Sequence, residues 1–337
     1  MEKQHRDFFA LKNNFKETED IQTLLIKKGE NNTAFFTVAI STHKRADLLK
    51  ETIDSVLSQQ GFDDFSILIV DDNPERNDES EHLIMQYSDE RISYYKNTRN
   101  MGMSGTWNRL FSLAQSENVI LLHDDDMLYP DALPVMKSVL EQTKSYYAAY
   151  CSTYMVYDMQ KMTEAPVQPE GSVDIVEMKT MDFIWGNIAG PPSGVCFRRQ
   201  AILDMGGFSK EFDLNLDYDF YVKLSHYYPI CRLDKHPLLI YRIKDNVSAK
   251  KETLLAMAYH DTIIRKGIVQ DKSFIKRSLW SSFLKVHAFR IIESLKHMYH
   301  NHEFDTREEF KKMGMMYNKF DSLIYKIMMR RYFKDKI

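Results

Sequence analysis

The chain has 337 residues, of which 44% are apolar and 28% charged, so it can form one large domain with an appendage, or two domains. No apolar run approaches the roughly 20 residues that cross a bilayer. Residues 1–32 are too polar for a secretory signal peptide, so we expect a cytoplasmic protein. Cys151, Cys196 and Cys231 lie far apart and form no CxxC pair, which argues against a zinc site or a disulfide framework.

The net charge of −3 is unevenly distributed along the chain. Residues 272–337 hold 15 Lys and Arg against 7 Asp and Glu, a local charge of +8 that leaves −11 for the remainder. A basic tail can indicate an anionic partner, either the inner face of the cell membrane or nucleic acid. No known nucleic-acid module is present, so we expect no nucleic-acid partner.

The first half of the chain alternates apolar runs with segments of helical periodicity. Residues 1–33 show weak helical spacing at Ile21, Leu24 and Leu25 and are expected to form a short helix or a loose arm. The predicted strands are 35–42, 65–70, 92–95, 119–122 and 146–157, and the predicted helices are 46–60, 79–87, a segment through Trp107 and Leu110, and 131–143. This alternation predicts a right-handed, mostly parallel α/β sheet.

Carboxylates follow two of these strands directly. Asp124, Asp125 and Asp126 follow 119–122, and Asp71 and Asp72 follow 65–70. Acids at the carboxyl ends of neighbouring parallel strands converge on one crevice, where a divalent cation between them and a phosphate-bearing substrate would relieve their repulsion. The plainer alternative for the triple is a solvated acidic turn that precedes a helix. The loop with Asn100 and Gly102 can present backbone N–H groups to phosphate, or simply form a turn.

The second half has a different character. Segment 190–194 predicts a rigid turn, 206–208 ends a short helix, and 231–241 predicts one more strand, with Arg242 and Lys244 bringing two cations to its end. Asp217 and Asp219 lie among aromatic residues at the start of a helix, where an acid can acquire the raised pKa of a general base or be an ordinary solvated residue. Residues 251–337 predict basic amphipathic helices, which either lie on an anionic membrane or pack on the preceding domain.

Taken in order, these motifs resemble the inverting glycosyltransferases of family 2, which have the GT-A fold. The motifs are Val38 to Thr42, Ile69 to Asp72, Asn100 to Gly102, Leu122 to Asp126 with Pro130, Gly206 to Phe208, and Asp217 to Asp219. The resemblance implies a Rossmann-like GT-A catalytic domain over 34–250, with a nucleotide-sugar half (34–157) and an acceptor half (158–250), followed by the helical region 251–337.

The resemblance also implies roles for individual residues. It places Ser41, Thr42, Asp71, Asp72, Asn100, Gly102 and Asp124 at the donor nucleotide, with Asp71 or Asp72 at the base and Asp124 at the ribose. Asp125, supported by Asp126, would bind Mn²⁺ or Mg²⁺ at the diphosphate. Asp217 would be the catalytic base that deprotonates the acceptor hydroxyl, and Arg242, Lys244 and Asp219 would contact the diphosphate or the acceptor.

The sequence departs from the family pattern at four places. His123 stands where many members have the first acid of the DXD motif, and we interpret it as a strand-end histidine bonded to a neighbour rather than as a metal ligand. Leu216 precedes Asp217 where Glu is frequent, and Lys244 stands where many relatives have histidine. Trp107 and Asn108 replace a frequent Arg-Asn pair.

These features predict a metal-dependent hexosyltransferase that extends an O-antigen, capsule or exopolysaccharide on a glycan or lipid-linked acceptor. A UDP-sugar is the expected donor, and a dTDP-sugar is an alternative because thymine offers the same N3–H. A nucleotidyltransferase would normally carry a glycine-rich loop after the first strand, and residues 42–46 contain no glycine. A non-catalytic nucleotide-sugar-binding protein would have no use for Asp217.

Overall fold

A computed structural model describes residues 7–30, 34–243, 251–298, 304–312 and 314–334, so the expected role of Lys244 lies outside the described residues. The strands are β1 Thr23–Lys27, β2 Phe36–Thr42, β3 Phe65–Asp71, β4 Ile92–Asn97, β5 Asn118–His123, β6 Met127–Leu128, β7 Ala149–Ser152, β8 Tyr154–Asp158, β9 Asp174–Met178, β10 Val195–Arg198, β11 Ile230–Asp234 and β12 Leu239–Ile243. The α-helices are α1 Ala46–Leu57, α2 Glu79–Gln86, α3 Gly102–Leu113, α4 Ala132–Gln142, α5 Arg199–Asp204, α6 Leu216–Tyr227, α7 Lys251–Ile268, α8 Phe274–Met298, α9 Thr306–Lys312 and α10 Lys319–Lys334. Three 3₁₀ helices are η1 Asn14–Thr18, η2 Thr180–Trp185 and η3 Lys210–Asn215.

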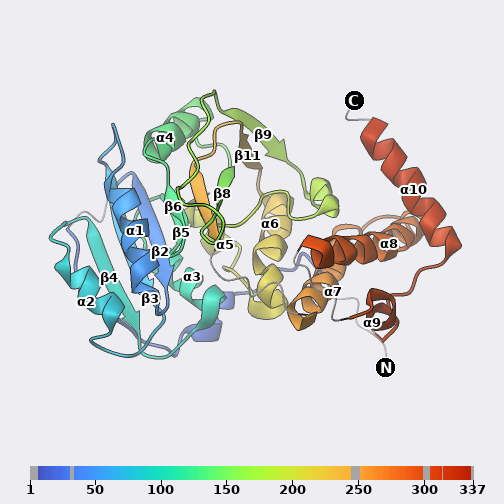
Figure 1. The fold of residues 1–337 in the computed structure, drawn as a ribbon, viewed down its shortest axis with the longest axis horizontal. Coiled ribbons are helices and arrows are strands. Elements are labelled where there is room, and N and C mark those ends of the chain that lie inside the picture. Colours follow the sequence, from blue (N-terminus) through green and yellow to red (C-terminus); the bar gives the residue numbers. More distant parts are fainter. Residues whose placement is uncertain (1–6, 31–33, 244–250, 299–303, 313, 335–337) are drawn as a thin grey trace.

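A nine-stranded sheet in the order β1-β4-β3-β2-β5-β10-β7-β11-β9 forms the centre of the molecule (Figure 1). Strands β4, β3, β2 and β5 are parallel, as expected from the sequence. Thr42 pairs with Asp71, and Ser41 pairs with His123. The carboxyl ends of β2, β3 and β5 therefore lie side by side, which confirms that the two acidic segments converge on one edge.

Helices cover both faces of the sheet. Successive strand residues point to opposite faces, and apolar side chains lie on both. Val38 and Ile40 pack in the core that includes α1, α2 and α4, whereas Ala39 packs in the core that includes α3 and α6. Every β2 residue except Ser41 is buried, which matches a continuous apolar run covered on both faces. The mixed α/β architecture with flanking helices and a C-terminal helical region is as expected from the sequence.

Three expectations about individual segments are wrong. Residues around Leu24 and Leu25 form β1, an antiparallel edge strand on β4, rather than part of a short helix or a loose arm. Segment 146–157 is two strands, because β7 belongs to the large sheet and β8 to a small sheet with β6 and β12. Segment 231–241 is likewise divided between β11 and β12. The divisions of the chain at residues 33, 157 and 250 stay predictions.

The small sheet β6-β12-β8 decides where the acidic triple lies. His123 ends β5 in the large sheet, and Met127 begins β6 in the small sheet. The tight connection between the two sheets is therefore formed by Asp124, Asp125 and Asp126. Its backbone is fixed at one end by β5 of the large sheet and at the other end by β6 of the small sheet.

The C-terminal helices pack on the rest of the molecule through α7 and α8. Ile264, Phe283 and Leu284 join the main core, and Trp185 of η2 packs against the ring of Phe283 with ring centroids 5.3 Å apart. Helix α10 lies across α8, where the rings of Tyr325 and Phe283 stack at 5.0 Å, and forms the outer edge of the molecule in Figure 1. Among the described helices, none is both long and apolar enough to span a membrane.

Candidate active site

Asp124 is fixed by the end of β2 and the turn that follows it. Its Oδ2 accepts hydrogen bonds from the Thr42 hydroxyl at 2.8 Å and the His43 backbone N–H at 3.3 Å, and its Oδ1 lies 3.3 Å from the Arg45 guanidinium. Burial raises the pKa of Asp124 to about 6, against the opposing effect of Arg45. The structure thus brings together Thr42 and Asp124, two of the residues expected at the donor nucleotide.

The side chains of Asp125 and Asp126 lie close to that of His123. One ligand atom from each of these three side chains lies within 4.8 Å of the others, which makes them a candidate divalent-cation site. Asp126 is completely buried, its Oδ1 accepts the Arg242 backbone N–H at 3.0 Å, and burial together with the Asp125 charge raises its pKa to about 7. Asp125 is partly exposed and lies 2.7 Å from Arg45.

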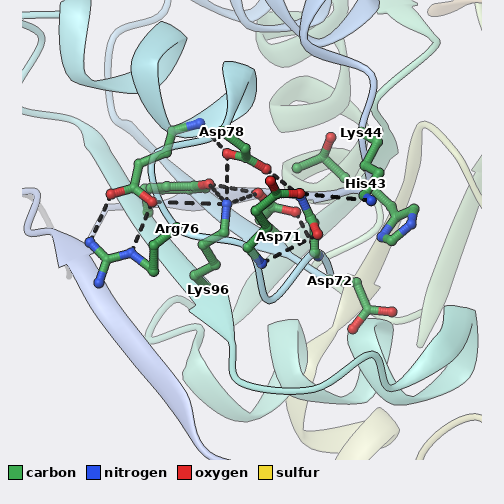
Figure 2. Close-up of polar contacts among 12 residues, drawn as sticks. His43, Lys44, Asp71, Asp72, Arg76, Asp78 and Lys96 are labelled. Carbon is green, nitrogen blue, oxygen red and sulfur yellow. Dashed lines mark hydrogen bonds and ion pairs between the residues drawn. The ribbon is translucent and has the colours of Figure 1, made fainter.

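The carboxylate of Asp71 lies in a buried charge network (Figure 2). Its Oδ2 accepts hydrogen bonds from the Tyr94 hydroxyl at 2.7 Å and the Lys96 ammonium at 2.9 Å, and its Oδ1 accepts the Asn73 backbone N–H at 2.9 Å. Lys96 is 1% exposed and also bonds Asp78 at 2.7 Å. Tyr94, Lys96 and Asn73 therefore already engage both oxygens of Asp71.

Asp72 organises the loop that leads into α3. Its carboxylate accepts hydrogen bonds from the Asn97 side chain at 2.9 Å and from the backbone N–H groups of Met101 at 2.8 Å and Gly102 at 2.9 Å. Burial raises its pKa despite these bonds. Gly102 has φ +70°, a conformation that favours glycine, and its N–H is directed to Asp72 and to the Asn100 side chain.

Trp107 and Asn108 connect two of the sequence motifs. The Trp107 indole donates to the Ser41 hydroxyl at 3.2 Å and stacks on the His123 ring, with centroids 5.4 Å apart. Asn108 bonds both the N–H and the carbonyl of Phe208, and an added Cβ at Gly207 would lie only 2.5 Å from its side-chain oxygen. The close Gly-Gly turn therefore packs directly against α3, the helix whose Trp107 stacks on His123.

Asp217 lies in the first turn of α6, half-buried. Its Oδ2 accepts a hydrogen bond from the Asn187 amide at 2.9 Å, and its Oδ1 accepts the Tyr218 backbone N–H at 2.7 Å. Burial raises its pKa to about 6, against these hydrogen bonds, which lower it. A carboxylate that titrates near neutrality is suited to accept a proton.

The segment 187–194 links Asp217 to the acidic loop. At one end Asn187 bonds Asp217 and the Gly190 carbonyl. At the other end the Ser193 hydroxyl accepts the His123 backbone N–H at 3.1 Å, and the Gly194 N–H donates to the Leu121 carbonyl at 2.7 Å. The rigid Gly-Pro-Pro-Ser-Gly turn predicted from the sequence thus joins the two candidate catalytic regions.

Two other residues expected at the site have different surroundings. The Arg242 guanidinium is buried and bonds the Leu48 carbonyl at 3.0 Å, Glu51 at 2.6 Å and the Asp125 carbonyl. It therefore connects the backbone of the acidic loop to α1. Asp219 is buried and pairs with Lys223 at 2.8 Å. Neither side chain is brought to the exposed face of the acidic loop.

Sequence reasoning missed Arg45, Lys96, Asn187 and Ser193 as residues of the site. Arg45 follows the first strand and could have been noticed as a cation opposite the acids. Lys96 and Asn187 carry no local signal, because the carboxylates they contact lie 25 and 30 positions away in the chain.

Comparison with known proteins adds family evidence. Residues 37–205 match the family model described as glycosyl transferase family 2. An uncharacterized glycosyltransferase of Methanocaldococcus jannaschii is 25% identical over 238 residues, covering 69% of this chain and 79% of that protein. A putative colanic acid biosynthesis glycosyl transferase of Escherichia coli, WcaA, is 27% identical over 124 residues, or 37% of this chain and 44% of that protein.

A solved structure has the same fold. Staphylococcus aureus TarS in complex with UDP-GlcNAc superposes with a TM-score of 0.52 at 13% identity, covering 84% of this chain and 93% of that one. This likeness shows a GT-A-like fold.

Proposed function

Because the chain belongs to glycosyl transferase family 2, we propose that it is a metal-dependent inverting glycosyltransferase that moves a sugar from a nucleoside diphosphate to a hydroxyl group. One observation carries the proposal. A raised-pKa carboxylate, Asp217, and a candidate cation site, His123 with Asp125 and Asp126, are held at the two ends of the segment 187–194. A nucleotidyltransferase or a binding protein would not need this pairing.

The proposed reaction assigns one proton transfer to this chain. Asp217 takes the proton of the acceptor hydroxyl while the acceptor oxygen forms a bond to the anomeric carbon of the donor sugar. The bond from that carbon to the diphosphate breaks on the opposite side. Attack opposite the leaving group inverts the anomeric centre. Asp125 and Asp126 would hold the divalent cation, Mn²⁺ or Mg²⁺, which supplies positive charge to the departing diphosphate.

The donor is proposed to be a UDP-sugar, with a dTDP-sugar as the alternative. The co-structure of TarS with UDP-GlcNAc supports a uridine donor in this fold. The protein side of this pocket would be formed by Ser41, Thr42 and Asp124, together with Asp72 and the loop of Asn100 and Gly102. The Asp71 carboxylate, already engaged by Lys96 and Tyr94, would contribute by holding β3 in place.

The test is a thermal-shift and turnover screen with UDP-, dTDP- and GDP-sugars, each with Mn²⁺, Mg²⁺ or EDTA. A ligand at about 100 times its Kd stabilises the folded state by about 2.7 kcal/mol, so binding is visible even if turnover is slow. We expect one nucleotide to raise Tm in the presence of metal. Asp125→Ala should lose that metal dependence, while Asp217→Asn should keep the shift and lose turnover. No shift with any donor would contradict the proposal.

We also propose that the acceptor is a lipid-linked glycan and that α10 rests on an anionic membrane. Phe320, Leu323 and Ile327 lie one helical turn apart and are 43–59% exposed. Lys319, Lys326 and Arg330 are exposed along the same helix, and no acidic side chain is exposed among its described residues. An apolar stripe flanked by cations is typical of helices that lie in a membrane interface.

Vesicle sedimentation tests this surface. The protein should co-sediment with phosphatidylglycerol vesicles but not with phosphatidylcholine vesicles, and Leu323→Ser with Ile327→Ser should abolish the binding. Self-association that disappears in the same double variant, measured by light scattering without vesicles, would instead assign α10 to a contact between two copies.

A further inference from the structure

His123 ends β5 with its imidazole enclosed between two elements. The ring stacks on Trp107 at an interplanar angle of 15°, and the side chain is 23% exposed. Its backbone N–H is fixed by the Ser193 hydroxyl. The ring is therefore held in position by groups that do not use its nitrogens.

The polar atoms around this ring are incompletely satisfied. Nδ1 of His123 lies 3.8 Å from Oδ2 of Asp126, which is too far for a hydrogen bond. Within the described part of the chain, neither Nε2 of His123 nor Oδ2 of Asp126 has a hydrogen-bond partner, although both atoms are buried. Leaving a buried polar atom unpaired costs about 1–3 kcal/mol, so a partner is expected at this position in the working enzyme.

The spacing fits a cation better than a direct bond. Ligand atoms from His123, Asp125 and Asp126 lie within 4.8 Å of one another. Two N or O ligands about 2.1 Å from one metal ion are at most about 4.2 Å apart, so adjustments of well under 1 Å would bring all three onto one ion. The expected hydrogen bond from His123 to a neighbour is not formed by Nε2 within the described residues, and Nδ1 lies 3.8 Å from Asp126.

We propose that His123 supplies an imidazole nitrogen to the same divalent cation as Asp125 and Asp126, and that this ligand favours Mn²⁺ over Mg²⁺. The inference rests on the proposed function, because it specifies the cation of that site. Mg²⁺ selects oxygen ligands and water, whereas Mn²⁺, as a first-row transition metal, also accepts an imidazole nitrogen beside carboxylates. A chain with histidine in place of the usual acid therefore gains metal preference at the cost of one negative charge.

Arg45 would have to share Asp125 with the bound cation. Its guanidinium lies 2.7 Å from Asp125, but the side chain is 50% exposed and reaches the acids from the turn after β2. It can therefore move away, or remain on Asp124, as a cation binds. The stacked face of Trp107 offers no competing ligand atom, because the indole N–H is used by Ser41.

Electron spin resonance on the full chain tests the proposal with Mn²⁺ as the probe. Loss of the free-Mn²⁺ signal measures binding, and electron spin echo envelope modulation detects a directly bonded nitrogen. We expect the nitrogen signal with and without UDP. It should be lost in His123→Asp and His123→Asn, and His123→Asp should also lower the ratio of the Mg²⁺ to the Mn²⁺ dissociation constant.

The controls separate the possible outcomes. Circular dichroism verifies that the variants fold, and Asp125→Ala tests whether the nitrogen signal belongs to this site rather than to another histidine. Bound Mn²⁺ without a nitrogen signal, or a signal unchanged in His123→Asn, would overturn the inference while leaving metal-dependent transfer intact. Absence of Mn²⁺ binding under every condition would contradict both the inference and the proposed metal dependence, and donor shifts in EDTA would then show whether the transferase proposal survives.

Discussion

Asp71 at the end of β3 and Asp126 in the loop after β5 are both completely buried carboxylates on one edge of the same sheet. Asp71 receives an ammonium group, a phenol hydroxyl and a backbone N–H. Asp126 receives a backbone N–H on one oxygen, and its other oxygen has no hydrogen-bond partner among the described residues. The two acids thus differ in their partners, not in their burial.

The difference suggests how to distinguish supporting acids from reactive ones. A buried carboxylate paired with a buried cation is a supporting contact, because loss of either partner leaves an uncompensated buried charge. Among the described residues, neither Asp126 nor Asp217 is hydrogen-bonded by a side-chain cation, although the charge of Arg242 lowers the pKa of Asp126. Burial outweighs these effects and raises the pKa of Asp126 to about 7 and that of Asp217 to about 6. Perturbed acids in one region are candidates for ligand binding and proton transfer.

Removing Lys96, the cation shared by Asp71 and Asp78, should have the largest effect on stability. Lys96→Met leaves the carboxylates of Asp71 and Asp78 without their shared ammonium group, which is 1% exposed. Removing one partner of a buried ion pair typically costs about 3–5 kcal/mol. We expect a loss of this size in the free energy of unfolding, measured by urea denaturation.

Arg45→Met is the matched control at the acidic loop, where Arg45 pairs with Asp124 and Asp125. Its guanidinium is half-exposed, so the loss should stay within about 1 kcal/mol. Equal losses of stability in Lys96→Met and Arg45→Met would contradict the distinction between supporting and reactive acids, because the acidic loop would then depend on its cation as strongly as Asp71 does.

The pH dependence of turnover should show the character of Asp217. Protonation of this carboxyl removes the base, so kcat/KM should fall as pH drops through about 6 and reach a plateau above it. The Asn187 hydrogen bond lowers the pKa of Asp217, so Asn187→Ala should move the acid limb to higher pH. The loss should therefore be greater at pH 6 than at pH 8.

A surface amide far from these contacts provides the control for this profile. Gln115→Ala removes an exposed amide that, among the described residues, bonds the nearby Leu113 carbonyl, and it should leave the acid limb in place. A loss in Asn187→Ala that is the same at every pH would assign Asn187 a purely structural role.

The sequence predicted the parallel strands and the acids at their ends because both leave local signals. The four strands from Phe36 to His123 are short apolar runs, and their pairing confirms the expected convergence. The edge strand β1 was missed because Leu24 and Leu25 are exposed and give no buried run. The divisions of 146–157 and 231–241 were missed because apolar density does not mark where a chain passes from one sheet to another.

The partners of the acids could not be predicted for a different reason. Whether Asp71 contacts Lys96, or one oxygen of Asp126 has no hydrogen-bond partner among the described residues, depends on which side chains the fold brings together across the sheet edge. The sequence showed that His123 departs from the family pattern, but its position within 4.8 Å of Asp125 and Asp126, with an unpaired Nε2 among the described residues, is visible only in the structure.

The smallest expected effect concerns the ion pair of Arg76 and Glu81, which lies beside Lys96. Glu81 is bonded by the half-exposed Arg76 through two N–H groups, and this contact lowers the pKa of Glu81 to about 2. A depressed carboxyl pKa contributes stability that is present above the unfolded pKa, near 4.5, and is lost as pH falls through about 2. Arg76→Gln should raise the pKa of Glu81, so the variant loses stability above about pH 4.5 and none below about pH 2. Salt and water screen the exposed guanidinium, which keeps the loss at pH 7 small, and acid unfolding should begin at a slightly higher pH. Acid titration followed by circular dichroism would measure the shift of the unfolding midpoint. Lys44→Gln is the control: the exposed Lys44–Glu75 pair is 3.9 Å apart, so its loss should leave the acid midpoint unchanged. An acid midpoint in Arg76→Gln identical to that of the parent would mean that Lys96, 3.9 Å from Glu81, is sufficient to hold this carboxylate in its charged form.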